Sequence, residues 1–233
     1  MTTLSFTVLP AGGAATPLSL NIDTLVIAGW AGRDAHAIQH HIDELAALGV
    51  APPSGTPLFY RVGADQLSQA ETIDVLGTHT SGEIECVLLA SPLGPLVAIG
   101  SDHTDRKAEV YSVAVSKQVC PKPVGRDAWR FADVAGHWDR LTMRATLVGA
   151  DGERRAYQSG AVDGLLPPPD LWRRYTEDGT LPPGSAMFSG TLAVQGAMAA
   201  MESGDAFELE LHDPVLERSL RARYAVHALP VVA

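Results

Sequence analysis

The stretch EIECVLLASPLGPLVAIGSDHTDR, residues 83–106, decides the fold of this chain. It holds two short apolar segments around a Ser-Pro-Leu-Gly turn, which is the pattern of a β-hairpin. Successive side chains of a strand point to opposite faces, so Glu83 and Glu85 share one face. The returning strand would bring Asp102 back beside them. The stretch therefore predicts two antiparallel strands with three carboxylates at one end.

The three carboxylates suggest a metal site. Carboxylates that converge without basic partners repel strongly, and a hard divalent cation resolves the repulsion. Mg2+ prefers oxygen ligands and keeps water positions open. The competing interpretation is that Glu83 and Glu85 form the solvated face of an ordinary strand. Residues 207–211, Phe-Glu-Leu-Glu-Leu, alternate in that way. Spacing alone leaves both interpretations open.

Composition limits the class of protein. The chain has 233 residues, of which 46% are hydrophobic, and one domain of this size buries roughly 70% of its surface. The net charge of −10, from 17 basic and 27 acidic residues, argues against a general nucleic-acid binder. No apolar stretch approaches the roughly 20 residues that span a bilayer, and the start carries no secretory pattern. We expect a cytoplasmic enzyme without nucleic-acid or membrane partners, with Cys86 in the core.

Strand patterns dominate the chain, because most apolar runs are short, rich in Val and Leu, and bounded by Gly, Pro, Ser or Asp. The predicted strands are 4–9, 24–28, 58–61, 83–89, 96–99, 110–115, 141–148, 186–189, 207–211 and 216–226. There is no regular βαβ alternation, which argues against a Rossmann sheet. The sequence predicts a β-rich α/β domain.

Three helices are predicted. The clearest covers 35–48, with Asp34 as N-cap and Gly49 as stop. A second begins after Arg126 and includes 128–138. A third begins at the proline run 167–169 and covers 171–175, since proline is tolerated in a first helical turn.

The first helix carries candidate bases. His40 and Glu44 are four residues apart, and His41 and Glu44 are three apart, so either pair can meet on a helix. The glutamate would orient the imidazole, which would take a proton from water. The alternative is an exposed polar helix face.

Three further residues become functional only if they border the carboxylates. Lys117 follows the predicted strand 110–115 and could hold an anionic substrate. Arg106 could do the same, or could pair with Asp105. Thr191 ends a Ser-Gly-Thr turn, where glycine permits close approach of a ligand, and could offer its hydroxyl or its N–H.

Taken in order, several segments resemble motifs of the fumarylacetoacetate hydrolase superfamily. The form that these motifs take in this chain is similar to the DUF2848 branch of that superfamily. The segments are 27–45, 57–61, 83–85, 101–107, 116–125 and 181–192. The match spans nearly the whole chain, and its specificity lies in the order of the motifs. Ser101 stands where the superfamily has Asn, and Lys107 where it has Asp.

The resemblance implies a mixed β roll with a few peripheral helices, usually dimeric. We expect a single catalytic domain over 1–233, with a lid helix and N-terminal strands in 1–60 and a metal-binding β roll in 61–233. The resemblance also implies that Glu83, Glu85 and Asp102 bind Mg2+ or Mn2+. The other implied residues are His41 or His40 with Glu44 and Lys117 for catalysis, and Arg106, Gln118, Thr191 and Tyr60 around the substrate.

The expected activity is that of a Mg2+-dependent hydrolase that cleaves a carbon–carbon bond in a small, acylpyruvate-like oxo-acid through a metal-stabilised enolate. Decarboxylases, hydratases and isomerases of oxo-acids use the same enolate and are alternatives. A non-catalytic ligand-binding relative is the alternative of another class.

Overall fold

The computed structural model describes residues 1–47 and 52–232, except for the side chains of residues 41, 44, 45 and 47. The larger sheet consists of strands β1 (Thr2–Val8), β2 (Thr16–Ile22), β3 (Thr24–Gly29), β4 (Leu58–Val62), β5 (Leu67–Ser68), β8 (Ile84–Leu89), β9 (Leu96–Ser101), β11 (Lys122–Arg130) and β14 (Ser185–Thr191). In the described residues these nine strands run in the order β2-β1-β11-β9-β8-β14-β3-β4, with β5 beside β11.

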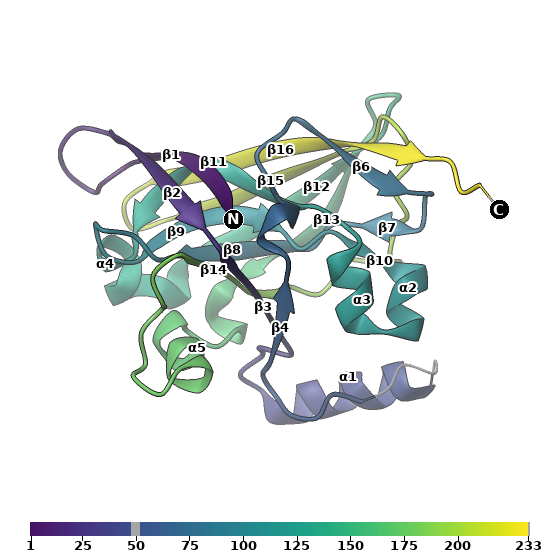
Figure 1. Cartoon of the computed structure of the whole chain (residues 1–233), viewed down its shortest axis with the longest axis horizontal. Helices are drawn as coiled ribbons and strands as arrows, with labels where there is room; N and C mark the ends of the chain where they lie inside the picture. The colour runs from purple at the N-terminus through teal and green to yellow at the C-terminus, as the bar shows by residue number, and fades with distance from the viewer. Residues whose placement is uncertain (48–51, 233) are drawn as a thin grey trace.

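A second sheet covers one face of the first. In the described part of the chain it has five strands: β6 (Thr72–Leu76), β12 (Thr142–Val148), β13 (Arg154–Ala161), β15 (Ala206–Asp213) and β16 (Arg218–Leu229). Their order is β13-β12-β15-β16-β6. A small sheet pairs β7 (Thr80–Ser81) with β10 (Thr104–Asp105). The predicted β-rich mixed roll is confirmed (Figure 1).

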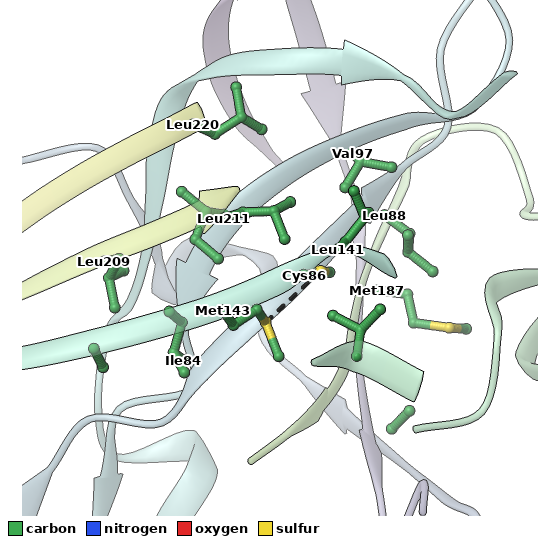
Figure 2. Close-up of a cluster of buried hydrophobic side chains, with 14 of the residues drawn as sticks. Ile84, Cys86, Leu88, Val97, Leu141, Met143, Met187, Leu209, Leu211 and Leu220 are labelled. Carbon is green, nitrogen blue, oxygen red and sulfur yellow. Dashed lines mark hydrogen bonds between the residues drawn. The ribbon is translucent and has the colours of Figure 1, made fainter. Parts of the chain in front are cut away.

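The predicted hairpin is present. Strands β8 and β9 pair antiparallel from Leu89–Leu96 to Ile84–Ser101, and all their residues are buried. On one face, Ile84 and Cys86 point toward side chains of the second sheet, as Figure 2 shows, and Cys86 Sγ lies 3.8 Å from Met143 Sδ. The other face packs on residues of β1, β2 and β3 in its own curled sheet. Burial on both faces explains the continuous apolar runs in the sequence.

Helices lie at the periphery: α1 (Ala35–Ala47), α2 (Arg106–Tyr111), α3 (Val113–Gln118), α4 (Phe131–Val134), α5 (Pro168–Tyr175) and the 3-10 turns Ala64–Gln66, Ala135–Arg140 and Val162–Gly164. The predicted cap of α1 is confirmed, because Asp34 Oδ1 accepts hydrogen bonds from the N–H groups of His36 and Ala37 at 2.8 and 3.2 Å. The predicted stop at Gly49 lies outside the described residues. Helix α1 lies at one border of the molecule (Figure 1). The proline-started helix is also confirmed.

The predicted strand 110–115 is wrong, because this segment belongs to helices α2 and α3. Asp105 caps α2 by accepting hydrogen bonds from the N–H groups of Lys107 and Ala108, both at 2.9 Å. Ser112 caps α3 in the same way. The run is rich in valine, which favours a strand, but Val110 and Val115 are exposed. Local capping outweighed β propensity here.

The predicted helix over 128–138 is wrong in its first part. Strand β11 continues to Arg130, and Ala128 and Trp129 pair with Ala98 and Val97 of β9. Both residues are fully buried. Helical structure begins only at Phe131. Strands β2, β6, β11 and β13 and the short strands β5, β7 and β10 were not predicted.

The close approach of strands at Gly100 yields a prediction for stability. A Cβ atom at this position would lie 2.6 Å from Pro123 O and 2.7 Å from Val87 Cγ2. We expect Gly100→Ala to lower the free energy of unfolding by roughly 1–3 kcal/mol, because overpacking forces backbone shifts. Urea unfolding measures the change. Gly136→Ala is the control, since a Cβ there meets nothing within 4 Å. Equal stability of the two variants would contradict the packing described.

Candidate metal centre

Three carboxylates lie together at one end of the β8–β9 hairpin. Glu83 precedes β8, Glu85 lies within it, and Asp102 follows β9. The Asp102 N–H donates to Glu83 O at 2.9 Å, which closes the end of the hairpin. One oxygen from each carboxylate lies within 4.8 Å of the others. Glu85 and Asp102 are buried, whereas the Glu83 side chain retains 17% exposure. The cluster could therefore hold a metal on its Glu83 side.

Basic side chains surround these acids and offset part of the repulsion between them. Lys117 Nζ donates to Asp102 Oδ2 and lies 3.7 Å from Glu83 Oε2. Lys122 Nζ lies 3.1 Å from Asp102 Oδ1 and donates to His103 O. Sequence reasoning missed Lys122. Its signal was a lysine in the apolar run Lys-Pro-Val-Gly, where a buried ammonium needs an acidic partner.

The surroundings shift the pKa values of the acids in opposite directions. Burial opposes ionisation of Asp102, but Lys117 and Lys122 outweigh it and lower its pKa to about 2. Burial, together with the charges of Asp102 and Glu83, raises the pKa of Glu85 well above its usual value. Burial alone would lower the pKa of Lys117, but Asp102 and Glu83 raise it. Asp102 and Lys117 are thus firmly charged, whereas ionisation of Glu85 is opposed by its burial and by the neighbouring acids.

Lys117 borders the cluster, although it lies in α3 and not at the end of a strand. Its side chain is 7% exposed. The ring of Tyr60 has its centre 5.8 Å from Lys117 Nζ, and the Tyr60 hydroxyl accepts a hydrogen bond from Trp30 Nε1 at 3.3 Å. Trp30 has a φ of 58°, which is rare for a bulky residue and is found at functional sites. Sequence reasoning placed Tyr60 near the substrate but missed Trp30.

Arg106 lies against the carboxylates and is fully engaged by side chains. It donates from Nε to Ser81 at 2.7 Å, and from its two terminal nitrogens to Glu83 and Glu109, both at 3.0 Å. The predicted alternative of pairing with Asp105 is wrong, because Asp105 caps α2. Arg106 thereby fixes the position of the Glu83 carboxylate.

The Ser-Gly-Thr end of β14 meets Glu85. Gly190, with φ of 102°, donates its N–H to Glu85 Oε2 at 2.7 Å. Thr191 donates its hydroxyl to Ile84 O at 2.8 Å, so this hydroxyl proton is already used within the protein. Gln118 is exposed and accepts the Gly63 N–H at 2.8 Å, which ties α3 to the end of β4.

The predicted lid residues are not all placed. The side chains of His41 and Glu44 lie outside the described residues, and His40 is exposed on α1. Behind the cluster, His103 is buried and its Nδ1 lies 2.9 Å from the Tyr224 hydroxyl. Burial lowers the pKa of His103 to about 3, so this imidazole is neutral.

Solved structures share this fold. A structure of Cg1458 matches with a TM-score of 0.65 and 17% identity, over 90% of this chain and 78% of that chain. A structure of 2-keto-3-deoxyarabinonate dehydratase matches with a TM-score of 0.65 and 16% identity, over 90% of this chain and 75% of that chain. A third structure is that of 2-keto-3-deoxy-D-arabinonate dehydratase complexed with magnesium and 2,5-dioxopentanoate. It matches with a TM-score of 0.62 and 16% identity, over 90% of this chain and 75% of that chain. These likenesses confirm the predicted fold class.

Sequence comparisons place the chain in a family. No curated protein matches the sequence of this chain. None of the described helices has the length and apolarity to cross a membrane. The sequence model of a family described as a protein of unknown function, DUF2848, matches residues 28–224. Because that match spans most of the sequence, the chain belongs to the DUF2848 family.

Proposed function

We propose that this chain is a divalent-metal-dependent enzyme acting on a small 2-oxo acid. The observation that carries the proposal is the convergence of Glu83, Glu85 and Asp102, whose oxygens lie within 4.8 Å of one another beside a charged lysine. Fold likeness to a dehydratase complexed with magnesium and 2,5-dioxopentanoate supports it. The proposed metal is Mg2+ or Mn2+.

The residues fit a hard divalent cation. All three donors are carboxylates, the ligands that such cations prefer. Asp102 Oδ1 is buried and accepts no hydrogen bond of normal geometry in the described residues. Glu85, whose pKa is raised, would become ionised beside a cation. A cation held there would polarise the keto group of the substrate and stabilise negative charge on its oxygen.

The positively charged side chains of Lys117 and Arg106 have different roles in this proposal. Lys117 stays charged and faces the cluster beside Tyr60, so it would hold the carboxylate of the substrate. Arg106 holds Glu83 through Nη2 while Ser81 and Glu109 fix its other nitrogens. Tyr60, Thr191 and Gln118 remain proposed substrate contacts. The Thr191 hydroxyl proton is already donated to Ile84 O, so a substrate contact by this residue would not use that proton.

The first candidate reaction is hydrolysis of a carbon–carbon bond in an acylpyruvate. It requires a base that takes a proton from water, and we assign this task to His41 or His40 with Glu44. The second candidate is a lyase reaction such as dehydration, and the dehydratase structures favour it. Decarboxylation and isomerisation are related outcomes. Metal and oxalate binding without turnover of any oxo-acid would identify a non-catalytic binder.

We also propose that the chain forms one catalytic domain and that it associates into a homodimer. Strands β1–β4 belong to the same sheet as β8 and β9, which supports one catalytic domain over 1–233, with lid helix and N-terminal strands in 1–60 and metal-binding roll in 61–233. Association into a homodimer remains a prediction.

The metal assignment makes a binding prediction. We expect Glu83→Gln and Asp102→Asn each to weaken Mn2+ binding at least about 100-fold, because ligand loss exceeds the roughly 10–100-fold effect of losing an outer contact. Isothermal titration calorimetry measures the affinity, and circular dichroism checks folding. The control is Glu208→Gln, a half-buried acid of β15 paired with Arg154. Wild-type affinity in both site variants would rule out this metal site.

The role of Lys117 makes a kinetic prediction. Lys117→Met should reduce turnover of a responsive 2-oxo acid at least about 100-fold while Mn2+ binding persists, because a positive charge next to the cluster disappears but the three carboxylates remain. The substrates are a panel of acylpyruvates, scored for bond cleavage, and 3-deoxy-2-oxo acids, scored for loss of water. Lys107→Met, an exposed neighbour, is the control. Unchanged turnover after Lys117→Met would exclude the proposed role.

The choice between hydrolysis and a lyase reaction rests on the lid. If hydrolysis is correct, His41→Ala or His40→Ala should slow cleavage of an acylpyruvate by about 100-fold or more, the usual contribution of a general base. Mn2+ affinity should stay unchanged. His36→Ala, on the same helix, is the control. Loss of water from a 3-deoxy-2-oxo acid with no acylpyruvate cleavage would favour the second candidate.

A further inference from the structure

A buried glutamine of the second sheet reaches the candidate metal centre. Gln158 lies in β13 and is fully buried. Its Oε1 accepts the N–H of Ile84 at 3.0 Å, and its Nε2 donates to Thr191 Oγ1 at 2.9 Å and to Leu192 O. Ile84 is the residue between Glu83 and Glu85. One side chain thus contacts both the Glu83–Glu85 segment and the Ser-Gly-Thr end of β14.

A β-bulge directs Gln158 inward. In the pairing of β12 with β13, Ala145 lies opposite Gln158 and Thr146 lies opposite Ala156, so Tyr157 is an extra residue. Regular alternation would bury only one of two successive residues, but both Tyr157 and Gln158 are buried. Bulges re-aim side chains in this way and are frequent beside functional sites.

A second irregularity creates the gap that Gln158 fills. The pairing of β8 with β14 shifts by one residue between Phe188, opposite Val87, and Thr191, opposite Glu85. Next to this shift, the N–H of Ile84 bonds to Gln158 and the C=O of Ile84 accepts the Thr191 hydroxyl at 2.8 Å. Both backbone groups of Ile84 are therefore satisfied by side chains instead of a neighbouring strand.

The donors and acceptors allow one arrangement. Leu192 O can only accept, so the amide nitrogen of Gln158 must face it and Oε1 must face the Ile84 N–H. The Thr191 hydroxyl donates to Ile84 O and must accept from Gln158. Gln158, Thr191 and Ile84 form a closed ring of hydrogen bonds, called here the Gln158 ring. Gln158 and Ile84 are buried and Thr191 is half-buried, so an unpaired polar group in this ring is costly.

We propose that Gln158 is a positioning residue that holds the Glu83–Glu85 segment in register with Thr191. The ring fixes the backbone of the intervening Ile84 at the point where β14 leaves the regular ladder. Both glutamates keep their common direction because this backbone cannot rotate. The effect on metal binding rests on the proposed function, whereas the effect on the strand does not.

The test uses Gln158→Met, which keeps side-chain length and removes the amide, and Thr191→Val and Thr191→Ser, of which only the second keeps the hydroxyl. Ser185→Ala is the control, since it removes a buried hydrogen bond to Pro182 O at the other end of β14. Amide hydrogen exchange by NMR reports on Ile84, and calorimetry reports on Mn2+ affinity.

We expect Gln158→Met and Thr191→Val to speed exchange of the Ile84 amide at least about tenfold relative to other β8 amides, and to weaken Mn2+ binding about 10–100-fold. Thr191→Ser and Ser185→Ala should stay close to wild type in both measurements. Unchanged Ile84 exchange in Gln158→Met would overturn the proposal, as would faster exchange with wild-type Mn2+ affinity. If the wild type binds no Mn2+, the metal assignment fails and the exchange result alone decides the role of Gln158.

Discussion

The buried contact of Asp102 with two lysines is the interaction on which the rest of the site depends. Lys117 and Lys122 approach different oxygens of this fully buried carboxylate. They come from α3 and from the start of β11, so one side chain joins both elements to the end of β9. Removing the partner of a buried charge typically costs about 3–5 kcal/mol when that charge is left uncompensated, but here either lysine still compensates Asp102 if the other is removed. The segment after the hairpin is therefore fixed by charge as well as by packing.

In the proposed enzyme, the charges of the cluster would link cation binding to substrate binding. Asp102, Glu83 and Glu85 face Lys117, Lys122 and Arg106, and Glu109 also pairs with Arg106, so four acids meet three bases when Glu85 is ionised. A divalent cation would leave this group with excess positive charge. An anionic oxo-acid would offset that excess, because its carboxylate and keto oxygens bring negative charge to the same place. A site with this balance suits an exchangeable cation and an anionic ligand better than a permanent structural ion.

The sequence specified the hairpin and the three acids because the signals are local. Alternation in residues 83–85 and the turn at 91–94 set the register that brings Asp102 back to Glu83. The cap at Asp34 is equally local. The strand predicted at 110–115 failed since Asp105 and Ser112 cap helices there. Lys122 and Gln158 escaped notice because their partners are distant in sequence, and because the bulge that turns Gln158 inward has no local pattern.

The most direct measurement is a crystal structure of the protein with Mn2+ and oxalate, which imitates the enolate of pyruvate, using the anomalous scattering of manganese. The account predicts a single strong peak between Glu83, Glu85 and Asp102, in direct contact with their carboxylate oxygens, with oxalate oxygens completing the coordination and Lys117 beside the oxalate. Manganese bound elsewhere, or oxalate on the lysines with no metal among the three carboxylates, would contradict it.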